Sequence, residues 1–252
     1  MTNKDVATPV RVALITGGTT GIGGATTREL AARGYHLLVT ALADPNNIQK
    51  EIRDGGGTIS FVKSDFAHAE RTAKEIVDAA ISLYGRLDLL VNCAGTISHK
   101  NLDEVTSADW DRIFAINLKA PFFMMQQAFP YLKKTQGNII NVSSTNALRP
   151  ARKNHLYDSL KAALNNLTKG FALEYREAGV RVNAIMPSGV RTPLVDQWLR
   201  EYLGREPNAA DFENPAIAEP IQIAKVIASL ASEEMAWING AELPVDGGYG
   251  LG

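Results

Sequence analysis

A tyrosine and a lysine four residues apart, Tyr157 and Lys161, form a pair that could move a proton. Residues 157–177 have a helical pattern, and positions i and i+4 of a helix lie on one face. An ammonium about 4 Å from a phenolate stabilises it by up to ~4 kcal/mol at an effective dielectric near 20. One pKa unit is ~1.36 kcal/mol, so the tyrosine pKa of ~10 could fall by two to three units. The pair is therefore predicted to exchange a proton with a substrate oxygen near neutral pH.

A glycine-rich turn near the N-terminus is the second feature that indicates chemistry. An apolar run at 12–15 leads into Gly17, Gly21 and Gly23, and a helical pattern follows at once. A strand, a glycine turn and a helix together present free N–H groups and the positive end of the helix dipole to an anion. Glycine is needed where a side chain would hold phosphates away or where φ is positive. The spacing G-x-x-x-G-x-G differs from the common G-x-G-x-x-G fingerprint, so a plain tight turn is the alternative.

The elements that must position these residues alternate along the chain. Strands are predicted at 11–15, 36–41, 58–62, 87–92, 137–142, 181–186 and 242–245, and helices at 22–33, 46–53, 69–84, 108–133, 157–177 and 221–231. Several strands are apolar on both faces, as in a sheet that helices cover on each side. The alternation predicts a doubly wound parallel sheet in a three-layer α/β/α arrangement. Ligands bind at the carboxyl ends of such strands, so segments 17–23, 92–95, 187–192 and Ser144 should meet at one edge.

Two further motifs complete a recognisable order. The sequence N-C-A-G stands at 92–95, V-D-G-G stands at 245–248, and Ser144 precedes Tyr157 by thirteen residues. In this order the chain resembles the short-chain dehydrogenase/reductase family in its typical single-domain form, from about residue 10 to 250. The resemblance implies a Rossmann-like fold and an oxidoreductase that transfers a hydride between a nicotinamide dinucleotide and a carbonyl or secondary alcohol. A dinucleotide-binding regulator, or a non-redox epimerase or dehydratase on the same fold, is the alternative.

The resemblance also assigns roles to individual residues. It implies that Tyr157 is the acid/base, that Lys161 lowers its pKa and bonds the nicotinamide ribose, and that Ser144 holds the substrate oxygen. Asn117 matches an asparagine that anchors a water in a proton relay to the lysine. The implied cofactor contacts are Gly17, Thr20, Gly21, Ile22 and Gly23 at the diphosphate, Asp65 and Phe66 at the adenine, Asn92, Ala94 and Gly95 beside its ribose, and Pro187, Val190 and Thr192 with Tyr157 and Lys161 at the nicotinamide. Ordinary structural roles, such as a helix cap for Asp65, are the alternative.

The residues after the second strand bear on the choice between NAD and NADP. An acidic residue there would bond the ribose 2′-OH, and an arginine would accept a 2′-phosphate. Residues 40–43 read T-A-L-A and supply neither, although Asp44 follows slightly later. Thr20 also stands where NADP-preferring relatives often carry a basic residue. NAD(H) is therefore predicted over NADP(H), unless a basic residue reaches the ribose from elsewhere.

The substrate is less readable. The segment 192–220 is long, interrupted by prolines and partly aromatic, and a long insertion at a ligand edge predicts a substrate-binding lid. A surface helix that packs on its own protein or on a neighbouring subunit is the alternative. Segment 149–155 is basic, through Arg149, Arg152, Lys153 and His155; it could favour an anionic substrate or be a solvated charge run. The prediction stops at a small to medium keto or hydroxy compound.

Composition bounds the remaining possibilities. With 252 residues and 45% hydrophobic content, one domain over 1–252 is expected, with 1–9 flexible. The 26 basic and 27 acidic residues are spread evenly, which predicts no nucleic-acid partner, and no apolar run is long enough to cross a membrane. A single cysteine, Cys93, fits a reducing, cytoplasmic location, and no metal site is predicted. The resemblance suggests a homotetramer with interfaces at 108–133, 157–177 and 237–252.

Overall fold

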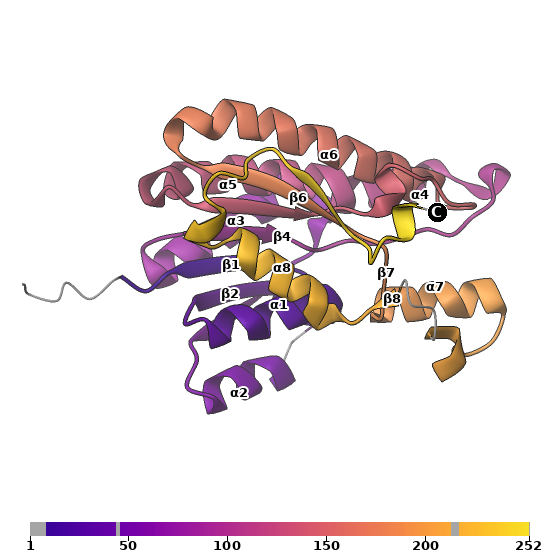
Figure 1. Ribbon diagram of the computed structural model, residues 1–252, viewed down its shortest axis with the longest axis horizontal. Helices are drawn as coiled ribbons and strands as arrows, with labels where there is room; N and C mark the ends of the chain where they lie inside the picture. Colours follow the sequence, from indigo (N-terminus) through magenta and orange to yellow (C-terminus); the bar gives the residue numbers. More distant parts are fainter. Residues whose placement is uncertain (1–8, 44–45, 213–216, 252) are drawn as a thin grey trace, which may run out of the picture.

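A seven-stranded parallel sheet forms the centre of the computed structural model, which describes residues 9–43, 46–212 and 217–251 (Figure 1). The strand order is β3-β2-β1-β4-β5-β6-β9. The strands are β1 (Val12–Thr16), β2 (His36–Ala41), β3 (Ile59–Lys63), β4 (Leu89–Asn92), β5 (Asn138–Val142), β6 (Arg181–Pro187) and β9 (Glu242–Val245). A small separate pair joins β7 (Gly189–Val190) to β8 (Ile217–Ala218). The predicted doubly wound sheet is confirmed. The predicted flexible start falls, apart from Pro9, outside the described residues.

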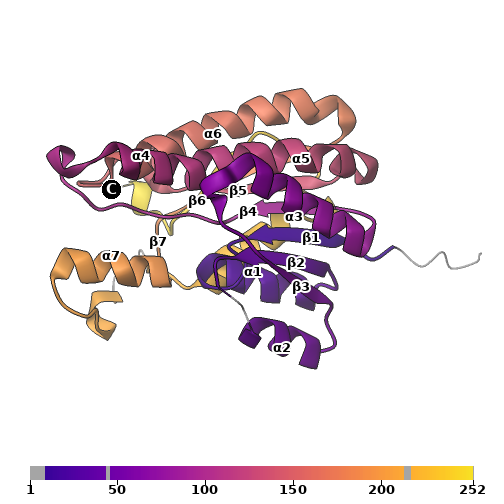
Figure 2. The same ribbon diagram turned by 180° about the vertical axis from the view of Figure 1, so that it is seen from behind.

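Helices cover both faces of the sheet, as Figures 1 and 2 show from opposite sides. One layer holds α1 (Gly21–Ala32), α2 (Asn46–Asp54) and α8 (Pro220–Leu230), and the other holds α3 (Ala69–Tyr84), α4 (Ser107–Phe114), α5 (Ala120–Thr135) and α6 (His155–Tyr175). Strand β1 explains this arrangement. Val12 and Leu14 belong to the core under α3, α5 and α6, whereas Ala13 and Ile15 belong to the core under α1, α2 and α8. A strand apolar on both faces thus fixes one layer of helices on each side.

The register brings the strand ends to a common edge. Thr16, the last residue of β1, pairs with Thr40 on one side and with Asn92 on the other. The turns that follow β1, β4 and β5 therefore leave the sheet at the same edge, as the sequence predicts. Thr16 also ties two of these turns together, because its hydroxyl accepts hydrogen bonds from the backbone N–H groups of Cys93 (3.0 Å) and Ala94 (3.1 Å).

The helix predicted over 108–133 is interrupted. A π-helical segment, Ala115–Lys119, separates α4 from α5 and contains Asn117. Such a wider turn is rare and often accompanies a functional site. The sequence pattern gave no sign of it, because a π turn changes the hydrogen-bond step without removing the apolar periodicity.

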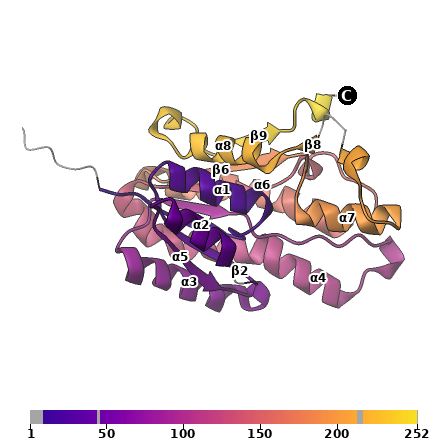
Figure 3. The ribbon, with the colours of Figure 1, turned by 90° about the horizontal axis from the view of Figure 1, so that it is seen from below.

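Helix α7 (Pro193–Leu203) stands apart from both layers, beyond the carboxyl ends of the strands (Figures 1 and 3). It begins at the N-cap Thr192, whose hydroxyl accepts from the N–H of Val195 at 3.3 Å. The segment predicted as a lid therefore contains a helix at the ligand edge, followed by a 3-10 turn (Ala209–Phe212); its residues 213–216 lie outside the described ranges. No helix in the described ranges is long and apolar enough to cross a membrane.

Candidate active site

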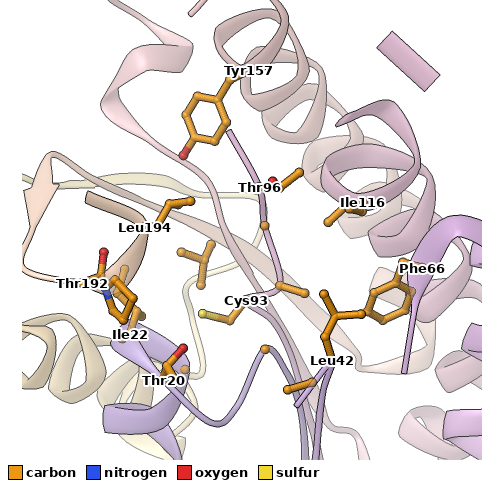
Figure 4. A pocket seen from close by; sticks show the side chains of 18 of the residues that line it. Thr20, Ile22, Leu42, Phe66, Cys93, Thr96, Ile116, Tyr157, Thr192 and Leu194 are labelled. Carbon is orange, nitrogen blue, oxygen red and sulfur yellow. The ribbon is translucent and has the colours of Figure 1, made fainter. Parts of the chain in front are cut away.

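One cavity of about 850 Å³ runs along the carboxyl edge of the sheet. Its wall is formed by the glycine turn, by the residues after β2, β3, β4, β5 and β6, and by the starts of α6 and α7. Figure 4 shows the hydroxyl of Tyr157 directed into this space, with Leu42 and Phe66 towards the other end. Of the predicted site residues, Gly17, Thr20, Gly21, Ile22, Gly23, Asp65, Phe66, Ala94, Gly95, Ser144, Tyr157, Lys161, Pro187, Val190 and Thr192 line the cavity.

Backbone conformation dictates the glycine turn. Gly17 and Gly21 have φ of +65° and +52°, which side chains rarely adopt. A Cβ on Gly23 would lie 2.1 Å from the carbonyl oxygen of Gly17. The N-cap residue of α1, Thr20, makes no side-chain capping bond, so its hydroxyl does not occupy the N–H groups of the first turn. A turn with glycines at its closest approaches and free N–H groups at a helix N-terminus fits a diphosphate.

The end of the cavity away from Tyr157 combines the glycine turn with the segments after β2 and β3, which are apolar with one carboxylate (Figure 4). Leu42 lines it and is 65% exposed in the protein alone. Asp65 caps the 3-10 turn Phe66–His68 by accepting from the N–H of Ala67 at 2.9 Å, so the ordinary cap role and a position on the cavity wall coexist. The lining residues that follow β2 and β3 include no basic side chain, while Asp44 lies outside the described residues.

Three polar groups meet at the opposite end of the cavity. Ser144 follows β5 and caps a 3-10 turn (Thr145–Ala147), its Oγ accepting from the N–H of Asn146 at 3.1 Å. Tyr157 and Lys161 come from the first two turns of α6. The Lys161 Nζ donates to the carbonyl of Val142 at 2.7 Å and lies 5.4 Å from the centroid of the Tyr157 ring. The convergence predicted from the sequence is therefore present.

Burial dominates the proton affinities of this pair. It raises the pKa of Tyr157 to about 12, against the opposing effect of a hydrogen bond with Ser144. It lowers the pKa of Lys161 to about 8. The sequence argument expected the ammonium to depress the tyrosine pKa; the structure shows instead that removal of the phenolate from water dominates. Cys93 also lines the cavity, and burial raises its pKa to about 12, which disfavours the reactive thiolate.

Two predicted residues do not line the cavity. The side chain of Asn92 is buried and donates to Asn141 Oδ1 at 2.8 Å. Asn117 is fully buried: its Nδ2 donates to the carbonyls of Thr96 (2.9 Å) and Ile113 (3.1 Å), and its Oδ1 accepts from the N–H of Thr96 (3.3 Å). Its side chain thus fastens the loop after β4 to the π-helical segment. The structure places it behind the wall, and the relay role implied by the resemblance stays a prediction.

Several wall residues carry no sequence signal of their own. They are mainly apolar side chains from α7, the loop after β2 and the helical run around 116, namely Leu42, Ile116, Leu194 and Val195. Proximity to a strand end could have indicated Leu42. The others reach the cavity only through the tertiary position of their helices.

The outer side of α7 is fastened to the loop after β4. The Trp198 Nε1 donates to His99 Nδ1 at 3.2 Å, and Asn154 Oδ1 lies 3.2 Å from the same nitrogen. Trp198 stacks on Tyr202 at 5.4 Å between ring centroids. His99 therefore joins α7 to the body of the protein. The basic residues Arg149, Arg152, Lys153 and His155 do not line the cavity.

Comparisons with known proteins agree with this geometry. The family model described as short chain dehydrogenase matches residues 11–202. A 2,5-dichloro-2,5-cyclohexadiene-1,4-diol dehydrogenase of Sphingobium indicum is 34% identical over 245 residues, covering 96% of this chain and 97% of that protein. A probable tetrahydroxynaphthalene reductase of Zymoseptoria tritici is 31% identical over 251 residues, covering 94% and 93%. The crystal structure of levodione reductase superposes with a TM-score of 0.89 at 27% identity, covering 96% and 98%.

Proposed function

The chain belongs to the short-chain dehydrogenase/reductase family of oxidoreductases that act on alcohol or carbonyl groups, and we propose that Tyr157 is its proton donor and acceptor. One observation carries this proposal: Ser144, Tyr157 and Lys161 meet at one end of a cavity whose other end contains the glycine turn at the start of α1. A nicotinamide dinucleotide, when bound, supplies or accepts the hydride. The protein residues then need only hold the substrate oxygen and move its proton.

The three polar groups divide this work. The Tyr157 hydroxyl, directed into the cavity (Figure 4), gives its proton to a carbonyl oxygen or takes one from an alcohol. Ser144 Oγ accepts from the N–H of Asn146 and is hydrogen-bonded to Tyr157, so its proton can turn from the tyrosine to the same substrate oxygen. Lys161, buried and one turn along α6, holds a second exchangeable proton beside the tyrosine ring. Together they keep the developing oxygen charge paired.

We infer a preference for NAD(H) over NADP(H). Gly17, Gly21 and Gly23 would hold the diphosphate, and Asp65 and Phe66 would face the adenine. A 2′-phosphate carries up to two negative charges that need a cationic partner. The described wall after β2 and β3 supplies none, and the 2′-phosphate would instead meet Leu42.

The wall near Tyr157 favours an uncharged substrate. Leu194, Val195 and Val190 line the cavity together with Arg112, and burying a carboxylate beside the three apolar side chains, away from Arg112, would be costly. The names of the two relatives above both contain ring compounds with hydroxyl groups, a diol and a tetrahydroxynaphthalene. We therefore propose that the substrate is an uncharged ring compound with a secondary alcohol or ketone.

A cofactor titration and a substrate panel test these proposals together. The purified protein is titrated with NADH and with NADPH, followed by quenching of tryptophan fluorescence. It is then assayed with cyclohexanone, acetophenone, pyruvate and acetoacetate. Tighter binding of NADH and reduction of the uncharged ketones are expected. Tighter NADPH binding would contradict the cofactor proposal, preference for the keto acids would contradict the substrate proposal, and binding of neither nucleotide would contradict the enzyme assignment.

The remaining sequence predictions concern assembly and location. Phe114, Leu118, Phe122 and Leu167 line a second hollow of about 410 Å³ on the α5 and α6 side, and Trp237 is fully exposed near the C-terminus. These apolar surfaces support the homotetramer implied by the family, which analytical ultracentrifugation would test; a monomeric mass would contradict it. The cytoplasmic location expected from the single cysteine belongs to the same set of proposals.

A further inference from the structure

A buried carboxylate adjoins the tyrosine, and its hydrogen-bond donors are neutral groups, the Asn146 side chain and the N–H of Ala151. Asp158 follows Tyr157 directly and is only 4% exposed. In the parts of the chain that the structure describes, no salt bridge involves it. Burial raises its pKa, and hydrogen bonds from Ala151 and Asn146 oppose that rise. Because an unpaired buried carboxylate is costly, its hydrogen-bond partners indicate what it does.

Those partners belong to the loop between β5 and α6. The carboxylate accepts from Asn146 Nδ2 at 2.8 Å through one oxygen and from the N–H of Ala151 at 2.7 Å through the other. One side chain on the first turn of α6 therefore holds the loop at two points. That loop carries Ser144 at its start.

Asn146 connects the carboxylate to the serine. Its backbone N–H donates to Ser144 Oγ at 3.1 Å, while its side chain donates to Asp158. Holding the Asn146 side chain therefore also holds the N–H that occupies a lone pair of the serine oxygen. With that lone pair occupied, the serine proton is directed elsewhere, and Ser144 and Tyr157 line the same cavity.

The same loop contains a strained residue. Lys153 has φ of +64°, in the left-handed region that a lysine rarely adopts. Such a conformation is strained and persists only where neighbouring contacts impose it. The bond of Asp158 to Ala151 and the bond from the N–H of Lys100 to the carbonyl of Lys153 at 3.1 Å are two such contacts.

We propose that Asp158 is a positioning residue that, through Asn146, fixes the hydroxyl of Ser144 and the loop 145–151 against the Tyr157 end of the cavity. This inference rests on the proposed roles of Ser144 and Tyr157. It goes beyond them because it assigns the orientation of the serine to a carboxylate outside the cavity wall. A simple stabilising contact at the start of α6 is the competing explanation, and the two make different predictions.

Four variants separate the two explanations. Asp158→Ala removes both bonds. Asp158→Asn removes the charge but keeps the shape, because its amide can donate to a flipped Asn146 side chain while its oxygen accepts from Ala151. Asn146→Ala removes the link and keeps the charge. Glu174→Gln removes an exposed carboxylate farther along α6 and is the control.

Hydrogen exchange gives a readout that needs no substrate. Backbone exchange of peptides covering 144–154 should accelerate in Asp158→Ala, because the N–H groups of Ala151 and Asn146 lose or loosen their acceptors. Asn146→Ala should accelerate the Asn146 end only, and Asp158→Asn and Glu174→Gln should resemble the wild type. Unchanged exchange at 144–154 in Asp158→Ala would overturn the proposal.

Activity gives the second readout, with NADH and the uncharged ketone that the wild type reduces best. The turnover number of Asp158→Ala and of Asn146→Ala should each fall roughly 10- to 100-fold, with unchanged affinity for NADH. The double variant should fall no further, because both act through one link. Wild-type turnover in Asp158→Ala would overturn the proposal. This holds whether the melting temperature of that variant is normal or reduced, because a reduced melting temperature alone indicates a stabilising contact and not a positioning role.

The pH profile distinguishes charge from position. The groups around Tyr157 are Lys161 on the same helix, Cys93 after β4 and Asp158 itself, and His155 faces Asp158. The negative charge of Asp158 raises the tyrosine pKa, so Asp158→Asn should move the alkaline-rising limb of alcohol oxidation to lower pH. Asn146→Ala, which keeps the charge, should not. Full activity in Tyr157→Phe would instead refute the proposed function, independently of this inference.

Discussion

The two ends of the cavity differ in whether backbone or side chains form the wall. At the glycine end the wall is mostly backbone, held by positive φ angles at Gly17 and Gly21 and by a contact that only glycine permits at Gly23. At the tyrosine end, the wall consists of side chains from loops and from α7, including Leu194 and Val195. A backbone wall constrains residue types and so leaves a motif in the sequence. A side-chain wall tolerates many residue types, so the substrate is much harder to predict from the sequence than the cofactor.

Apart from Tyr157→Phe, the largest effect is expected at Lys161, which belongs to the tyrosine end but would also contact the cofactor. Lys161→Ala removes the buried ammonium beside Tyr157, and turnover should fall about 100-fold or more, with weaker NADH binding. The neighbouring Ser159→Ala is the control, because the exposed Ser159 hydroxyl bonds the carbonyl of His155 in its own helix. Steady-state kinetics and NADH titration of both variants provide the test. Wild-type turnover in Lys161→Ala would show that the lysine has no role in proton transfer.

A substitution at the glycine end can disrupt cofactor binding without changing the residues of the tyrosine end. A Cβ at Gly23 would lie 2.1 Å from a backbone oxygen, so Gly23→Ala must displace the turn. We expect the dissociation constant for NADH to rise roughly 30- to 100-fold. Gly170→Ala is the matched control, because a Cβ there meets nothing within 4 Å, and a helical alanine adds about 0.5–1 kcal/mol of stability. Equal NADH affinity in the two variants would show that the glycine turn is not the binding site.

The pH dependence sharpens the description of the tyrosine end. Tyr157 and Lys161 are close enough to titrate as a pair, with burial setting the lysine near pKa 8 and the tyrosine near pKa 12. Alcohol oxidation requires that the pair has lost a proton, so its rate should rise as the pH increases through about 8. Carbonyl reduction requires the tyrosine proton, which is retained at that pH, so its rate should not fall there. A kcat for alcohol oxidation that does not rise through pH 8, or a kcat for carbonyl reduction that falls there, would contradict this assignment.

The smallest effect is expected at the contact between α7 and the loop after β4. Trp198→Phe keeps the stacking on Tyr202 but removes the bond to His99. A neutral hydrogen bond contributes about 0.5–1.5 kcal/mol, so KM for the ketone should rise about 2- to 10-fold while NADH affinity stays constant. A change in NADH affinity instead would mean that α7 does not serve the substrate end alone.

The sequence predicted the sheet well because its strands are apolar on both faces. The predicted helix over 69–84 and the predicted strands over 36–41 and 242–245 have the observed bounds. Segments with clear periodicity or turn chemistry were therefore readable, including the end of α3 at Gly85 in the left-handed conformation. The π-helical segment, the placement of Asn117 behind the wall and the raised pKa of Tyr157 were not. Each depends on packing or burial that only the folded chain defines, and the link from Asp158 to Ser144 crosses a loop whose path no motif records.

Replacement of Tyr157 by phenylalanine tests the central claim most directly. The claim is that one end of the cavity binds the dinucleotide while the tyrosine hydroxyl at the other end moves the proton. Tyr157→Phe removes one oxygen atom, so NADH should bind with nearly wild-type affinity while ketone reduction falls by roughly 10²- to 10⁴-fold. Turnover close to that of the wild type, measured on a variant that still binds NADH, would contradict the account.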